Sequence, residues 1–425
     1  MRRSTIQSLS AGQIDSALSS IATFIAGLYA LRAFDAGLLG AYVVMFTAWN
    51  LARSLASELV FVPSEVVAVS LPSADRIHVL RSSVIRGTAV SLLGGAGVYA
   101  ARLLIVDSAG AQASTALALS AVAVTILAPL QEHWRRMFHI AGSSWRAAIV
   151  STLHLIVTVV SIIVLKALVH VAWVPLGCLA VGFAVSSVAS WVLTHNLPTD
   201  GTDTQGQPTW PELIGIGKWL LLANTSAMGS DFLLAVIVDA AIGSEMLGYA
   251  EGARVIARPV VILGVGLAAV LGPRSVAAGL NSDLDRATRP RHAFWLVSTV
   301  AGVLYMLVVG WHWPLNPLQN ILPLAYEVHW LIPLAIAGAL VYNLAQPWWF
   351  EALGARRQRS AAMAETAGAV LKIATGFFAG TLQAFTLPVA WLLAWIVRAV
   401  GLGNTSASIF AHRKATEPAP SESSA

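Results

Sequence analysis

The sequence predicts an all-α integral membrane protein whose twelve transmembrane helices form two six-helix lobes. Three observations support this prediction. Of the 425 residues, 57% are hydrophobic and only 11% are charged, whereas soluble domains carry about a quarter charged residues. Apolar runs of about 20 residues, the length that crosses a bilayer, recur along the whole chain. Basic residues gather in short segments between these runs, as they do between transmembrane helices.

Each apolar run is long enough to be a helix, and only helices or closed barrels satisfy backbone hydrogen bonds in lipid. The runs of the first lobe cover Ile14–Leu31, Leu38–Val62, Gly87–Val106, Ala113–Leu130, Ala147–Leu168 and Val171–Leu193. The runs of the second lobe cover Trp219–Val238, Met246–Leu271, Ala293–Val309, Trp330–Trp348, Ala361–Leu382 and Leu387–Phe410. We interpret the first run as a retained helix and not as a signal peptide, because no small-residue cleavage site follows it.

A polar segment rich in Gly, Pro and Thr separates the two sets of runs. It predicts a first lobe at residues 1–196, a cytoplasmic linker at 197–212 and a second lobe at 213–410. The polar end of the chain, residues 411–425, is expected to be a disordered cytoplasmic tail.

The distribution of basic residues predicts that both termini are cytoplasmic. With this orientation, inner segments hold 18 of the 26 Lys and Arg residues, outer loops hold only Arg32, and seven lie inside the runs. Cytoplasmic loops carry such an excess in membrane proteins, so the separation favours twelve crossings. We expect a multi-pass protein of the bacterial cytoplasmic membrane, in contact with membrane lipids.

Several functional classes are disfavoured by what the sequence contains. The net charge of +5 comes from loop residues, so nucleic-acid binding is not expected. Cys178 is the only cysteine, which excludes an intrachain disulfide and leaves no cysteine-based metal site. No G-x-x-x-x-G-K-[ST] run is present. We therefore expect no cofactor, and energy from a coupling ion such as H⁺ or Na⁺, from the membrane potential or from a substrate gradient.

A short internal similarity indicates a duplication of six helices. Aligning Gly40 of "DAGLLGAY" with Gly248 of "AIGSEMLGYA" also places Phe24 opposite Phe232. Repeats with an even number of helices are parallel and are related by an axis along the membrane normal. Secondary transporters carry their substrate site between such repeats.

Charged residues inside the apolar runs are the candidate site, because each costs about 3 kcal/mol at the bilayer centre. In the second run Asn50 and Arg53 share a polar face with two serines. In the eighth run Glu251, Arg254 and Arg258 lie on one face, where one carboxylate cannot neutralise both arginines. The remaining candidates for the cavity or for ion coupling are Glu58, Asp15 and Asp231. Clustered guanidinium groups suit a phosphate, since Arg offers paired donors and keeps its charge.

Purely structural roles are the alternative for each of these charges. Arg53 is near the cytoplasmic end of its run and could extend to the interface. The charges of the eighth run could pair with Asp231 or Glu58, and Lys372 and Arg398 could pair with Glu365 or reach an interface. Asp15 and Asp231 could be polar packing groups or coupling-ion sites.

Four motifs resemble the polysaccharide biosynthesis proteins of the multidrug/oligosaccharidyl-lipid/polysaccharide (MOP) flippase superfamily. They are "DSALSS" (Asp15–Ser20), "LRAFDAGLLGAY" (Leu31–Tyr42), "LARSLASE" (Leu51–Glu58) and "GYAEGARVIARPV" (Gly248–Val260). The resemblance covers about the first 65 residues and the seventh and eighth runs. It implies a MATE-like fold with a central cavity between the lobes. The chain departs from relatives with fourteen helices, because it lacks the last two, which bear a lipid-tail groove in some of them.

The resemblance also implies a function. Such flippases move a polyprenyl-diphosphate-linked oligosaccharide or polysaccharide precursor from the inner to the outer leaflet. The matching cavity cations here are Arg53, Arg254 and Arg258, with Asn50 beside them and Asp15 and Asp231 lining the same cavity. Glycan polymerases or glycosyltransferases of the same pathway are the expected protein partners.

Two other functions remain open at the level of the sequence. One is an ion-coupled small-molecule or multidrug antiporter of the same superfamily. The other is an integral-membrane glycosyltransferase or polymerase. For the latter, the outer loop at 310–329 holds only Glu327 as an acid, and the Asp283-x-Asp285 pair is typical of a solvated loop. We therefore expect a transporter and not an enzyme.

Overall fold

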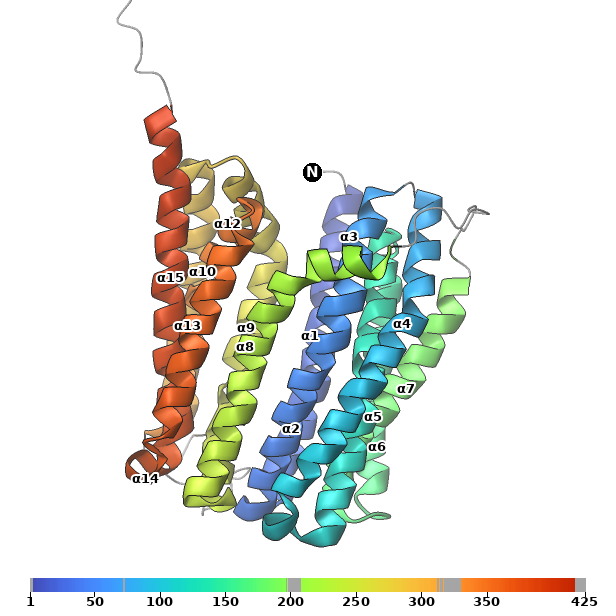
Figure 1. Ribbon diagram of the computed structural model, residues 1–425, viewed down its shortest axis with the longest axis vertical. Helices are drawn as coiled ribbons and strands as arrows, with labels where there is room; N and C mark the ends of the chain where they lie inside the picture. Colours follow the sequence, from blue (N-terminus) through green and yellow to red (C-terminus); the bar gives the residue numbers. More distant parts are fainter. Residues whose placement is uncertain are drawn as a thin grey trace, which may run out of the picture.

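The computed structural model describes residues 3–71, 73–195, 197, 208–311, 313, 316 and 330–416, and its described elements are helices (Figure 1). The first half contains α1 (Arg3–Ala33), α2 (Ala36–Ala56), α3 (Val62–Ser70), α4 (Ser73–Ala100), α5 (Val106–Ile140), α6 (Ser144–Leu165) and α7 (Val174–His195). The second half contains α8 (Trp210–Ile242), α9 (Ser244–Leu280), α10 (Leu284–Val309), α11 (Leu331–Leu344), α12 (Gln346–Gly354), α13 (Gln358–Gly376), α14 (Ala379–Leu382) and α15 (Thr386–Thr416).

The all-helical membrane fold expected from the sequence is confirmed. Within the described part of the chain, ten helical segments are long and apolar enough to cross a membrane. The long helices α9 and α13 are not among them, and both carry buried charges: Glu251 in α9, and Glu365 and Lys372 in α13. The number of twelve crossings and the cytoplasmic position of the termini stay predictions. Figure 1 shows that α1 begins and α15 ends at the same end of the molecule, as an even number of crossings requires.

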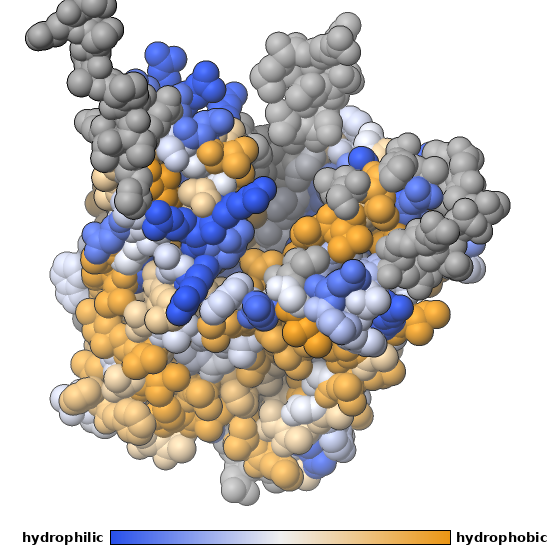
Figure 2. Space-filling model, turned by 45° about the horizontal axis from the view of Figure 1, so that its top comes forward, coloured by the Kyte–Doolittle hydropathy of each residue, from blue (hydrophilic) through white to orange (hydrophobic). Residues whose placement is uncertain are grey.

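The helices pack as two groups. The helices α1 to α7 pack on one another, and α9, α10, α11, α12, α13 and α15 form the second group, with α8 packed on both α13 and α2. Further contacts between the groups join α2 and α1 to α9. Figure 2 shows hydrophilic residues gathered at the end where α15 finishes, with hydrophobic residues over the remaining part of that face.

Two of the predicted boundaries differ from the structure. The linker was expected to run to residue 212, but α8 begins at Trp210, because Thr209 and Glu212 form a capping box in which each satisfies a backbone N–H. The tail was expected from residue 411, but α15 continues to Thr416. Most of the linker and the end of the tail lie outside the described residues.

The two halves meet in a reciprocal contact at the start of α2 and α9, which we call the glycine seam. A Cβ atom on Gly40 would lie 2.1 Å from the carbonyl oxygen of Ser244. A Cβ on Gly248 would lie 2.2 Å from the carbonyl oxygen of Ala36. Only glycine permits this approach. Each glycine therefore meets the residue four positions before its counterpart, so the two contacts are equivalent under the sequence alignment of Gly40 with Gly248.

A second close approach joins the end of α2 to α8. Between α2 and α3 the chain forms one π-helical turn, Ser57–Phe61, a feature that is common at functional sites. A Cβ on Gly217 of α8 would lie 2.1 Å from the carbonyl oxygen of Glu58 in this turn. The turn also brings the Glu58 carboxylate within 2.6 Å of Asn224 Nδ2 in α8. The start of α8 is thereby held against the first half of the molecule.

Candidate functional site

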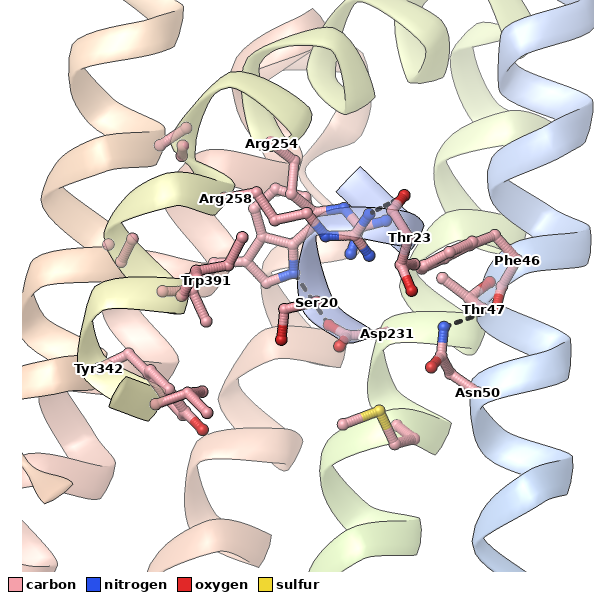
Figure 3. A pocket seen from close by; sticks show the side chains of 18 of the residues that line it. Ser20, Thr23, Phe46, Thr47, Asn50, Asp231, Arg254, Arg258, Tyr342 and Trp391 are labelled. Carbon is pink, nitrogen blue, oxygen red and sulfur yellow. Dashed lines mark hydrogen bonds between the residues drawn. The ribbon is translucent and has the colours of Figure 1, made fainter. Parts of the chain in front are cut away.

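A cavity of about 440 Å³ lies between the two halves. On one side it is lined by α1 and α2, with Ser20, Thr23, Phe46, Thr47 and Asn50 (Figure 3). The opposite side consists of α8, α9, α11 and α15. The resemblance implied a central cavity between the lobes, with candidate residues from the first two helices of each half, and the structure adds α11 and α15 to the cavity wall.

The polar end of the cavity is formed by the two arginines of α9. The Nε and Nη2 atoms of Arg254 each donate to a carboxylate oxygen of Glu251 at 2.5 Å. Glu251 is buried and does not line the cavity itself. Arg258 has no carboxylate partner among the described residues, and its Nη1 donates to the Thr23 carbonyl oxygen of α1 at 3.3 Å. Glu251 therefore pairs with only one of the two arginines, in line with the expectation that one carboxylate cannot neutralise both.

The ring of Phe46 in α2 contacts the guanidinium groups of both Arg254 and Arg258. The centres of the Arg254 and Arg258 guanidinium groups each lie 5.0 Å from the centre of its ring. Such contacts stabilise a cation that is partly removed from water. The side chains of Arg254 and Arg258 lie together in Figure 3, beside Thr23.

The other predicted cation of α2, Arg53, also lines the cavity. Its guanidinium lies 5.8 Å from the centre of the Trp49 ring, and no hydrogen bond or ion pair joins it to a described residue. Asn50 lines the cavity one turn earlier, and its Nδ2 donates to the Phe46 carbonyl oxygen at 2.8 Å. The Oδ1 atom of Asn50 therefore remains available to accept a hydrogen bond from a ligand.

Asp231 of α8 is the one carboxylate among the lining residues of the cavity that the structure describes. Its Oδ1 accepts from Lys372 Nζ of α13 at 2.8 Å and from Trp391 Nε1 of α15 at 2.9 Å. Lys372 is only 1% exposed and lies behind the cavity wall. The sequence placed Lys372 with Glu365 or at an interface, and this prediction was wrong.

Aromatic side chains that were not predicted as cavity residues form the wall opposite α2. Tyr342, Trp391 and Trp395 line the cavity. Arg398 lies behind them, 5.1 Å from the centre of the Tyr342 ring, and pairs with Glu365 as predicted. The spacing of two tryptophans and one arginine at positions i, i+4 and i+7 within the last apolar run was the available signal, because it places them on one helix face.

The charged side chains in and around the cavity sum to a net positive charge. Arg53, Arg254, Arg258 and Lys372 are cationic, whereas Asp231 and Glu251 are the carboxylates that contact these groups or line the same space. The formal excess is two positive charges. In a space of low dielectric, such an excess favours an anionic ligand.

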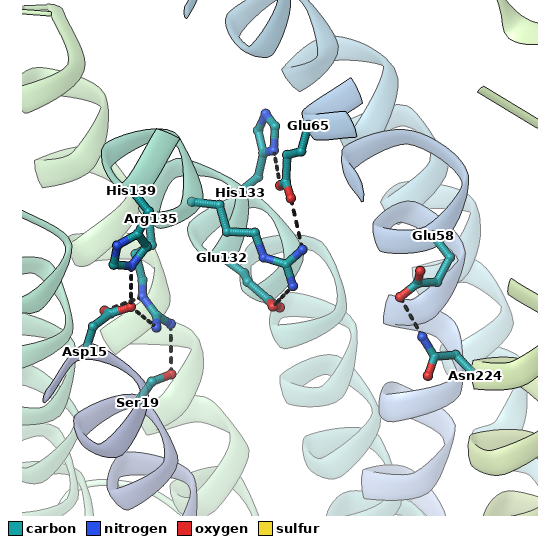
Figure 4. A network of polar contacts seen from close by, with 10 residues as sticks. Asp15, Ser19, Glu58, Glu65, Glu132, His133, Arg135, His139 and Asn224 are labelled. Atoms are coloured by element: carbon teal, nitrogen blue, oxygen red, sulfur yellow. Dashed lines mark hydrogen bonds and ion pairs between the residues drawn. The ribbon is translucent and has the colours of Figure 1, made fainter. Parts of the chain in front are cut away.

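Two predicted candidates lie elsewhere. Asp15 of α1 does not line the cavity; its two carboxylate oxygens accept from Arg135 of α5 at 2.8 and 2.7 Å. His139 also contacts this carboxylate (Figure 4), and the Ser151 hydroxyl donates to it. The implied cavity position of Asp15 is therefore corrected: a bidentate ion pair inside the first half holds it. Glu58 is likewise absent from the cavity lining and bonds to Asn224.

A second polar network, which the sequence did not predict, adjoins Asp15 in Figure 4. Arg136 of α5 bridges Glu65 of α3 at 3.0 Å and Glu132 at 2.5 Å. His133 Nδ1 lies 3.1 Å from Glu65. These contacts join α3 to the end of the long helix α5.

The described residues show no group of three or more His, Cys, Asp or Glu side chains that could hold a metal ion. Asp283 of the D-x-D pair caps α10 by accepting from the Arg286 backbone N–H at 3.0 Å. This local role accounts for Asp283 without a nucleotide sugar.

No family model matches the sequence, and no curated protein matches it. Solved structures do match. A multidrug resistance MATE family transporter of the MOP superfamily in its inward-facing conformation has a TM-score of 0.70 and 15% identity, covering 95% of this chain and 96% of that one. The outward-facing conformation of such a transporter gives 0.68 and 15%, covering 97% of both chains.

A third match is a MOP superfamily transporter from Pyrococcus furiosus, described as having a binding pocket of reverse polarity that suggests a different function. Its TM-score is 0.64 at 13% identity, with 96% of this chain and 95% of that chain covered. The chain thus has the fold of MATE and MOP transporters over nearly its whole length. At these identities the similarity concerns the fold alone.

Proposed function

We propose that this protein is an alternating-access transporter of a phosphate-bearing anion. We further propose that the substrate is a polyprenyl-diphosphate-linked oligosaccharide or polysaccharide precursor, moved from the inner to the outer leaflet of the bacterial cytoplasmic membrane. The observation that carries the proposal is the pair of cavity arginines, Arg53 and Arg258, that have no carboxylate partner among the described residues.

The chemistry of the cavity supports a diphosphate as the bound group. Arg258 and Arg254 present guanidinium donors from one helix, and Arg53 presents a third from α2. Guanidinium groups bind phosphate oxygens with paired hydrogen bonds and stay charged at every relevant pH. The hydroxyl groups of Ser20 and Thr23 and the aromatic wall offer contacts to a sugar, while the prenyl chain would remain in the membrane.

Alternating access is supported by the way in which the halves are joined. Polar residues from both halves of the molecule line the cavity, and the glycine seam joins the two halves at one end. Rocking of one repeat against the other around a fixed site is the usual motion of such folds. The energy source is a proposal as well: a proton or sodium gradient, the membrane potential or the gradient of the substrate.

A small-molecule or multidrug antiporter is the second candidate function. The fold of the matched multidrug transporters favours it, and so does the aromatic wall. Cationic drugs need acidic cavities, however, and here the carboxylate of Asp231 is engaged by Lys372. Uptake of ethidium into proteoliposomes with an imposed proton gradient distinguishes the two: transport of the dye, without transport of a prenyl-diphosphate sugar, would establish the antiporter.

The proposal is tested by translocation of a fluorescent short-chain prenyl-diphosphate sugar in proteoliposomes. Dithionite bleaches fluorophores in the outer leaflet, so the bleached fraction reports transfer between leaflets. We expect R258A to lower the translocation rate by about 100-fold, since a hydrogen bond to a charged group contributes about 1.5–3 kcal/mol and the variant also loses a cavity charge.

A matched control uses an arginine outside the cavity. Arg286 lies in the first turn of α10, and its side chain is 74% exposed and pairs with Asp283. The variant R286A is expected to translocate as the unmodified protein does. Equal rates for R258A and R286A, at equal reconstitution, would refute the proposed function.

A further inference from the structure

The pair formed by Lys372 and Asp231 occupies the border between the cavity and the core of the second half. Asp231 lines the cavity, whereas Lys372 lies behind it and is 1% exposed. We propose that Lys372 is a positioning residue that maintains the excess of positive charge in the cavity, because it engages Asp231 and so keeps the arginines available to an anion. This inference rests on the proposed function, since it names the residue that selects the substrate class.

The geometry shows how Lys372 is held. Its ammonium group lies 2.8 Å from Asp231 Oδ1 and 3.4 Å from the Ala227 carbonyl oxygen, both in α8. It also lies 5.1 Å from the centre of the Trp395 ring. These three contacts fix the ammonium group of Lys372 beside the Asp231 carboxylate.

The same carboxylate is fixed from a second side. Trp391 Nε1 donates to Asp231 Oδ1, the oxygen that Lys372 also contacts. Figure 3 shows Asp231 below the arginines, beside the indole nitrogen of Trp391. Both partners bind the same oxygen, and they hold the Asp231 carboxylate toward α13 and α15.

The arginines are the groups that Asp231 would neutralise without Lys372. Asp231 is close enough to Arg254 to attract it electrostatically. Without Lys372, the Asp231 carboxylate would be free to attract the cavity arginines, of which Arg258 and Arg53 have no carboxylate partner among the described residues. The formal excess of positive charge would fall from two to one. An isolated carboxylate at the wall would also repel a phosphate.

A series of variants that changes only this pair tests the inference. The variants are K372M, D231N and K372M/D231N, whose formal cavity excess is one, three and two positive charges. The probe is inorganic diphosphate, bound to the purified full-length protein in detergent and measured by calorimetry. R258A is the reference for loss of the anion site.

We expect D231N to bind diphosphate about tenfold more tightly than the unmodified protein, and K372M to bind it about tenfold more weakly. Each variant changes the cavity by one unit charge a few ångströms from a multivalent anion, which accounts for a change of about this size. The double variant should bind as the unmodified protein does. A purely structural role of the ion pair predicts that both single variants weaken binding. If K372M does not fold, D231N and the double variant still decide, because the inference requires tighter binding in D231N and recovery in the double variant.

The failure of the inference and the failure of the proposed function give different results. If diphosphate binding follows the charge series but no prenyl-diphosphate sugar is translocated, the inference stands and the proposed substrate is wrong. If R258A abolishes translocation but D231N binds diphosphate no more tightly than the unmodified protein, the proposed function stands and the role of Lys372 is refuted. Absence of diphosphate binding to the unmodified protein would refute the inference.

Discussion

Individual charges in the membrane-spanning helices of this protein are mostly paired across helices. Arg135 binds Asp15 from 120 positions away, and Lys372 binds Asp231 from 141 positions away. Glu251 and Arg254 are three positions apart on one helix. Helical spacing could therefore predict the last pair, whereas the first two depend on which helices become neighbours. A single sequence does not contain that information.

The Arg398–Glu365 pair shows what such a pair contributes to stability. Both side chains are buried, and the Arg398 guanidinium also contacts the rings of Tyr342, Trp349 and Trp395. We expect R398M to destabilise the protein by about 3–5 kcal/mol, because Glu365 is left buried without its cation. Thermal unfolding in detergent measures this effect.

The double variant R398M/E365Q is the control for that prediction. It removes both charges and leaves no buried ion unpaired, so its unfolding temperature should lie well above that of R398M. Equal unfolding temperatures for the two variants would show that the packing of Arg398, and not its charge, stabilises this region.

At the scale of secondary-structure elements, close helix contacts depend on small residues at particular positions. The glycine seam brings the beginnings of α2 and α9 together, and neither contact would tolerate a Cβ atom. The sequence predicted that Gly40 and Gly248 are equivalent, but it did not predict that they face each other's helix. The π-helical turn Ser57–Phe61 was also not predictable, because its residues fit an ordinary helix equally well.

Substitution of Gly40 tests the seam. In G40A the new Cβ would overlap the Ser244 carbonyl oxygen, so α2 and α9 must separate at this end. We expect a longer distance between spin labels at R32C and A241C, two exposed positions at the same end, measured by pulsed electron resonance. The native Cys178 is buried and should not react with the label.

The matched control for that substitution is G97A. A Cβ on Gly97 meets no atom within 4 Å, so the label distance should equal that of the unmodified protein. A distance that is unchanged in both variants would mean that the seam accommodates a methyl group without moving the helices.

At the scale of the whole molecule, the fold was predictable because it depends on patterns that repeat along the chain. Apolar run length and the placement of basic residues indicated the helices, and two motifs at equivalent positions indicated the duplication. The cavity wall was predictable only on the side of α1, α2, α8 and α9. The contributions of Tyr342 in α11 and of Trp391 in α15 arise from how the second half folds back on α9.

A cross-link across the seam tests whether the halves must separate there during transport. We expect the double variant A36C/S244C, joined by a short bifunctional maleimide, to translocate substrate at less than about a tenth of its rate before cross-linking. Each single variant, treated with the same reagent, should keep its rate. Full activity of the cross-linked protein would show that the seam stays closed throughout the cycle.

The reciprocity of the seam has a consequence for the origin of the chain. When residue i of one partner meets residue j of the other, and j meets i in return, the contact has the form of an isologous interface between identical subunits. Gly40 with Ser244 and Gly248 with Ala36 follow this rule inside one polypeptide. Two copies of a six-helix ancestor could make the same contact across a two-fold axis, before gene fusion allowed each copy to acquire its own side chains. The cations of α9 and the neutral Phe46 and Asn50 at the corresponding positions of α2 are an example of such divergence.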